Sequence, residues 1–153
     1  MTSESQPSAA LEAAARRRRE LRDSLFALEE AISSPVRTPD QWREIVCDRL
    51  LAMQNAFADH VTETESPGGL YDELEDMDIN IVSSARRLRE EHPSLTALIG
   101  AKVATFQAPF PDGADLGEIR DDVQRVMGRI VRHRQQGSDL VWQAYAIDIG
   151  TAG

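Results

Sequence analysis

The sequence predicts an all-α protein that folds as an up-down-up-down antiparallel four-helix bundle. In four long segments, apolar residues recur at alternating steps of three and four, the spacing of a helix with one buried face. Ala, Leu, Arg and Glu dominate the composition and favour helix, because their side chains lose little rotamer freedom there. Short connections between the segments then require antiparallel neighbours. No segment shows the strict alternation typical of a strand.

The first helix is expected over residues 9–33, after a disordered tail at residues 1–8. Pro35 ends this helix, because a proline disfavours helical geometry in the residue before it. Only Arg18 interrupts the apolar face. The apolar members of that face are Leu11, Ala14, Leu21, Leu25, Leu28 and Ile32. We assign residues 9–150 to one domain, a usual length for a single core.

The second helix begins at a capping box. Thr38 is a favoured N-terminal cap, Pro39 suits the first helical position, and Gln41 completes the box. The buried face then comprises Trp42, Val46, Leu50, Met53, Phe57 and His60. The sequence Ser-Pro-Gly-Gly at residues 66–69 disrupts the helix.

The third helix is expected to run across Pro93 as one kinked helix, because the apolar phase is the same on both sides of it. Two starting points remain open for this helix, at Gly69 and at residues 76–78. Prolines and a glycine at residues 108–113 predict a turn. The fourth helix follows over residues 116–144, again with steps of three and four.

All three histidines of the chain lie on these buried faces: His60 in the second helix, His92 in the third and His133 in the fourth. Residues of two antiparallel helices share one height when they are equally distant from the intervening turn. His92 and His133 meet this condition about residues 112 and 113. His60 and His92 meet it only if their helices turn near residue 76. The three histidines are therefore expected to surround the core at one level.

Three histidines at one level form a candidate metal site. Neutral imidazole binds iron, zinc, copper and manganese, and rings from three helices can enclose one ion. Glu63 shares the helix face of His60 and is the expected additional ligand. We therefore predict one iron or zinc ion bound by His60, His92, His133 and Glu63. The alternative is a metal-free cluster, since a buried histidine is commonly a core residue held by hydrogen bonds.

Three short stretches around these histidines resemble hemerythrin-like (HHE-type) proteins. They are Phe57-Ala58-Asp59-His60 with Glu63 and Glu65, Leu88-Arg89-Glu90-Glu91-His92, and Arg132-His133-Arg134-Gln135-Gln136-Gly137. The resemblance covers about residues 18–150. It implies an up-down four-helix bundle with a non-haem di-iron centre that binds dioxygen or serves in iron, oxygen or redox sensing.

The chain departs from that family at four ligand positions. Ala13 or Ala14 stands where the first helix should carry a histidine, Thr64 replaces a glutamate, Leu88 replaces a histidine, and Gly137 replaces an acidic residue. Only His60, His92 and His133 carry over. The expected function is thus a hemerythrin-like metal-binding domain whose di-iron site is reduced to a three-histidine cluster. The alternative is a metal-free bundle that serves as a structural or protein-interaction module.

Composition limits the partners. The net charge is −9, and an acidic domain is repelled by phosphate backbones and by anionic membranes, so we expect neither nucleic acid nor a membrane as a partner. A homodimer or an unidentified protein partner fits the acidic surface. The single cysteine, Cys47, excludes an intramolecular disulfide and suits the cytoplasm. No phosphate-binding loop or nucleophile motif indicates an enzyme.

Overall fold

A computed structural model describes residues 8–151 of the chain, with side chains as far as residue 146. Within those residues all regular structure is helical, which confirms the all-α prediction there. The five helices are α1 (Ala9–Ser33), α2 (Pro39–Glu65), α3 (Leu70–Leu74), α4 (Ile79–Gln107) and α5 (Leu116–Thr151). Residues 1–7, most of the predicted tail, lie outside the described residues.

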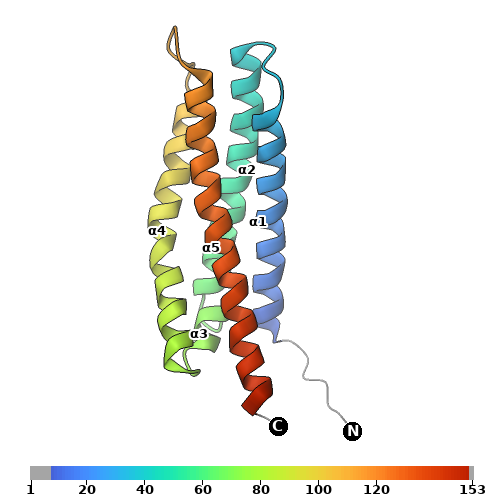
Figure 1. Ribbon diagram of the computed structural model, residues 1–153, viewed down its shortest axis with the longest axis vertical. Coiled ribbons are helices and arrows are strands. Elements are labelled where there is room, and N and C mark those ends of the chain that lie inside the picture. Colours follow the sequence, from blue (N-terminus) through green and yellow to red (C-terminus); the bar gives the residue numbers. More distant parts are fainter. Residues whose placement is uncertain (1–7, 152–153) are drawn as a thin grey trace.

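The four long helices lie side by side along the long axis of the molecule (Figure 1). The α1–α2 and α4–α5 connections lie at one end, and α3 lies at the other end, near the start of α1 and the end of α5 (Figure 1). Helix α1 packs mainly on α2, α2 on α4, and α4 on α5. The long helices thus form a bundle whose buried faces meet along a common axis.

Two helices begin at side-chain caps. Thr38 accepts a hydrogen bond from the Gln41 amide at 3.2 Å, as the capping box predicts. Ser8 accepts from the Leu11 amide at 3.0 Å and donates to Glu73 at 2.9 Å. Ser8 therefore caps α1, although the sequence analysis placed it in the disordered tail.

The connection between α2 and α4 combines both of the turns that the sequence left open. Helix α2 ends at Glu65, and α3 follows before α4 begins at Ile79. His60 lies five residues before the end of α2, whereas His92 lies 13 residues after the start of α4. At about 1.5 Å per residue, α4 therefore begins roughly 12 Å farther down the axis than α2 ends. Residues 66–78 span this difference and place α3 beneath α2. Helix α4 continues through Pro93 without interruption.

The buried core consists of two apolar clusters with the histidines between them. The first apolar cluster comprises Leu21, Leu25, Leu28, Ala31, Ile32, Trp42, Val46, Leu50, Met53, Phe57, Leu95, Ile99, Val103, Phe106, Val123, Val126, Met127 and Ile130. The second apolar cluster comprises Ala14, Leu70, Tyr71, Leu74, Ile81, Ala85, Leu88, Leu140 and Ala144. On α1 the boundary between the clusters falls at the half-buried Arg18, the residue that interrupts the apolar face. The core therefore contains a polar layer at one height.

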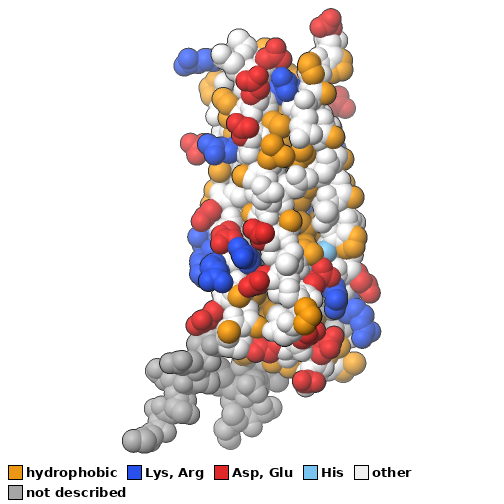
Figure 2. All heavy atoms as spheres, turned by 180° about the vertical axis from the view of Figure 1, so that it is seen from behind, with side chains coloured by type: hydrophobic (Ala, Val, Ile, Leu, Met, Phe, Trp, Pro, Cys, Tyr) orange, Lys and Arg blue, Asp and Glu red, His pale blue; other side chains and the backbone are white. Residues whose placement is uncertain are grey.

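The outer surface carries both acidic and basic side chains with small apolar areas among them, as the rear view in Figure 2 shows. Among the described residues, no helix has the length and apolar character needed to cross a membrane.

Candidate metal centre

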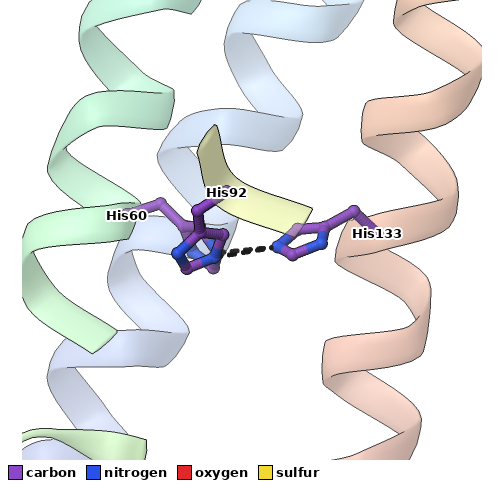
Figure 3. A group of neighbouring side chains, drawn as sticks. All are labelled: His60, His92 and His133. Carbon is purple, nitrogen blue, oxygen red and sulfur yellow. Dashed lines mark hydrogen bonds between the residues drawn. The ribbon is translucent and has the colours of Figure 1, made fainter. Parts of the chain in front are cut away.

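The side chains of His60, His92 and His133 converge in the bundle interior, as predicted (Figure 3). They are only 5%, 2% and 2% exposed. The Nε2 atom of His133 lies 3.3 Å from Nε2 of His60 and 3.2 Å from Nε2 of His92. Ligand atoms of all three residues lie within 4.8 Å of one another. We call these three residues the histidine cluster, and by its geometry it could hold a metal ion.

The phenyl ring of Phe57 covers one side of the histidine cluster. Phe57 lies one helical turn before His60 on the same face of α2 and is 1% exposed. Its ring centroid lies 5.8, 5.8 and 6.0 Å from the centroids of His60, His92 and His133. Phe57 is therefore almost equally distant from the three imidazoles and separates them from the rest of the first apolar cluster.

Carboxylates stand behind two of the three imidazoles. The Nδ1 atom of His92 lies 3.4 Å from Oε2 of Glu65, whose other oxygen accepts from Nε of Arg89 at 3.1 Å. The Nδ1 atom of His133 lies 3.4 Å from Oε1 of Glu91. A carboxylate behind a metal-binding imidazole fixes its tautomer and raises its basicity. Among the described residues, no carboxylate is paired with His60, and neither Nδ1 of His60 nor Nδ1 of His92 makes a hydrogen bond; the His92–Glu65 contact is an ion-pair separation.

Glu63 is not brought into this cluster, contrary to the sequence prediction. Successive side chains on a helix are about 100° apart, so residues 63 and 65 diverge from Thr64, the buried residue between them. Glu63 is partly exposed and acts electrostatically on Arg17 of α1. Glu65 instead points toward Arg89 and His92 of α4. The carboxylates next to the cluster are therefore Glu65 and Glu91.

A tyrosine outside the predicted buried faces also contacts the cluster. The hydroxyl of Tyr71 lies 3.3 Å from Nε2 of His92, and the residue is 6% exposed. Burial raises the pKa of Tyr71 to about 12, so the isolated phenol is neutral. Its position depends on α3, which the sequence pattern did not separate from the third helix. In the sequence, the one indication of this contact is that Tyr71 stands beside the turn whose position was left open.

Burial keeps the three imidazoles neutral. Desolvation lowers the pKa of His60 to about 3, and electrostatic repulsion from His92 and His133 in their protonated forms adds to this shift. Burial and His133 lower the pKa of His92 to about 4, although Glu65 and Glu91 oppose the shift. Burial also lowers the pKa of His133, against the influence of Glu91. Each ring therefore carries one N–H and one free lone pair at neutral pH, the form that binds metals.

The placement of protons decides what the centre of the cluster can accept. If the Nδ1 protons of His92 and His133 face Glu65 and Glu91, both Nε2 atoms direct lone pairs into the centre. These two nitrogen atoms are 3.2 Å apart, and lone pairs that face each other at this distance repel unless a cation or a hydrogen-bond donor lies between them. A metal ion would engage both. Without an ion, Tyr71 O–H can donate to His92 and Nε2–H of His60 can donate to His133.

The separations match those of ligands on one ion. Two nitrogens bound at about 2.05 Å to a tetrahedral ion are about 3.3 Å apart. The two separations from His133 Nε2, 3.3 Å to His60 and 3.2 Å to His92, agree with this value. For the third pair, His60 and His92, the ligand atoms lie within 4.8 Å of each other, and a shared tetrahedral ion requires about 3.3 Å.

Gly137 leaves open space beside α5. It occupies the position where the resembled family has an acidic residue. A Cβ atom built there would meet no heavy atom within 4 Å, leaving aside the nearby backbone of its own helix. The residue is also partly exposed rather than buried. Among the side chains that the structure describes, none fills this position, and glycine itself offers no acidic ligand there.

Comparisons with known proteins give no family for this chain. No protein-family model, curated protein or solved structure matches it. The hemerythrin-like resemblance therefore stays a prediction from the three short stretches that contain the histidines.

Proposed function

We propose that this chain is a hemerythrin-like, up-down-up-down four-helix bundle that binds one iron or zinc ion through His60, His92 and His133. One observation supports this most directly. The Nε2 atoms of His92 and His133 lie 3.2 Å apart, while a carboxylate stands behind Nδ1 of each ring. This arrangement of imidazole and carboxylate is the one that metal-binding histidines usually have.

The proposed donors suit both metals. Neutral imidazoles bind zinc and iron well, and helices that meet along buried faces hold three such rings in place. Phe57 excludes water from one side, and the two carboxylates offset part of the charge of a divalent ion. Such an ion would supply a Lewis acid or, with iron, a redox-active centre. The resemblance to hemerythrin-like proteins favours a role in iron, oxygen or redox sensing.

A metal-free structural or protein-interaction module is the second candidate, and a specific observation favours it. Hydrogen bonds from Tyr71 to His92 and from His60 to His133 would satisfy both central lone pairs without an ion. In that state the histidine cluster is a polar layer that fixes the register of the four helices, as buried polar groups do in some helical assemblies.

The two candidates differ in metal content. The test is elemental analysis of the full chain purified without a His-tag, followed by calorimetric titration of chelator-treated protein with Zn²⁺ and, without oxygen, with Fe²⁺. We expect one ion per chain, and loss of binding in His133→Leu, because His133 contacts both other rings. Absence of binding in the folded parent protein would leave the metal-free module.

A further inference from the structure

The histidine cluster has one covered side and one side that faces another polar group. Phe57 lies 5.8–6.0 Å from all three imidazole centroids and closes the side toward the first apolar cluster. Three imidazoles around one tetrahedral ion leave a fourth coordination position. With Phe57 on one side, that position points toward the second apolar cluster.

Tyr71 enters from the second apolar cluster. Its hydroxyl oxygen lies 3.3 Å from Nε2 of His92, and its ring centroid lies 5.8 Å from that of His92. The Tyr71–His92 separation equals the separation between His60 and His133 within the cluster. These contacts form a chain from His60 through His133 and His92 to Tyr71, and each has about the length expected between neighbouring ligands of one ion.

The short helix α3 holds Tyr71 in this position. The adjacent Gly68 has a φ of +74°, a backbone conformation that glycine adopts without strain, and its amide donates to Asp72 at 2.8 Å. Glu73 accepts hydrogen bonds from Ser8 of the α1 cap and from Tyr145 of α5, at 2.9 and 2.7 Å. Helix α3 is thus tied to two other helices, and its tyrosine is aimed before any ion binds.

We propose that the hydroxyl oxygen of Tyr71 is the fourth protein ligand of the ion held by the histidine cluster. This inference rests on the proposed function and deepens it. When the oxygen binds the ion, the phenol proton passes to water. The ion then has three nitrogen ligands and one oxygen ligand, all from the protein.

A fourth protein ligand determines which kind of site this is. Zinc sites with four protein ligands are structural, whereas catalytic sites keep one position for water or substrate. With zinc, a site closed by Tyr71 is therefore structural rather than catalytic. Phenolate oxygen is also a hard ligand, which suits ferric iron and zinc and disfavours cuprous copper.

The test is the electronic spectrum of the full chain loaded with Fe²⁺ and then oxidised to the ferric state. A phenolate ligand gives ferric iron a visible charge-transfer band and phenolate vibrations in the resonance Raman spectrum, which imidazole ligands do not. For Zn²⁺, the near-ultraviolet difference spectrum of ionised tyrosine is the equivalent signal. The chain has two tyrosines, so Tyr145→Phe is the control for a signal from the other phenol; it removes one tie of α3, but the Ser8–Glu73 and Gly68–Asp72 hydrogen bonds remain.

We expect the phenolate signal in the parent and in Tyr145→Phe, and its loss in Tyr71→Phe. The Tyr71→Phe protein should still bind one ion, with affinity lowered about tenfold or more, because the histidines remain. An ion bound by the parent without a phenolate signal, or a signal that survives in Tyr71→Phe, overturns the inference and leaves the three-histidine site. A parent that binds no ion overturns both proposals.

Discussion

The Nε2 atoms of His92 and His133 lie 3.2 Å apart in the centre of the bundle, and each ring turns its Nδ1 atom toward a glutamate on an adjacent helix. Glu65 of α2 stands behind His92 of α4, and Glu91 of α4 stands behind His133 of α5. Both glutamates are partly exposed, so the cluster is connected to the surface through its carboxylates.

Removal of either carboxylate should weaken metal binding. In Glu65→Gln and Glu91→Gln the imidazoles lose the carboxylates that lie 3.4 Å from their Nδ1 atoms, and the affinity for Zn²⁺ should fall about 10–100-fold. Competition with a chromogenic chelator measures the change.

Glu63→Gln is the matched control, because Glu63 lies on the same helix as Glu65 but outside the cluster. The affinity of the Glu63→Gln protein for Zn²⁺ should equal that of the parent. A loss in Glu63→Gln as large as in Glu65→Gln would show that Glu63 is a ligand, as the sequence analysis predicted.

The stability of the metal-free protein should fall as the pH is lowered from 7.5 to 5. The pKa of His60 is about 3 in the folded chain, whereas an unfolded histidine titrates near ~6.5. Between these values the unfolded state binds more protons, so acid favours unfolding. For His60 alone the loss at pH 5 is about 2 kcal/mol. Urea unfolding of chelator-treated protein at several pH values measures it.

His60→Leu provides the comparison for this experiment, since it removes the imidazole with no carboxylate partner. Its stability should depend less steeply on pH than that of the parent over the same range. Identical slopes in the two proteins would mean that His60 is not held neutral by the fold.

Gly137→Ala should stabilise the protein by about 0.5–1 kcal/mol. The new methyl group meets no heavy atom within 4 Å, and alanine favours helix over glycine. Gly128→Ala, on the same helix with the same open surroundings, should gain a similar amount. Denaturant unfolding measures both variants. A loss of stability confined to Gly137→Ala would indicate that the glycine is needed for close approach of another group.

Much of the fold was predictable because helix periodicity and caps are local signals. The bounds of α1 and the start of α2 at Pro39 follow from residues within one turn of each end. The separate helix α3 was missed, because it has only five residues and its position depends on packing against α1, α2 and α4. Short helices held by tertiary contacts carry little periodicity of their own.

The candidate site was predictable only along the buried faces. Equal distance from the turns predicts that the three histidines meet at one height, but it does not predict which side chains reach from the edge of one helix to the next. Glu91 points about 100° away from His92 on the same helix and for that reason meets His133 on α5. Tyr71 was missed because its contact depends on α3 rather than on a periodic face.

X-ray absorption at the metal edge tests most directly whether the histidine cluster binds an ion. The sample is the untagged full chain, loaded with one equivalent of Zn²⁺ and passed through a desalting column. We predict a coordination shell of four nitrogen and oxygen atoms at about 2.0–2.1 Å, with the outer-shell scattering of three imidazoles. In His133→Leu the ion should be lost, because His133 contacts both other rings. A parent protein that retains no zinc, or whose zinc shows no imidazole scattering, would contradict the account.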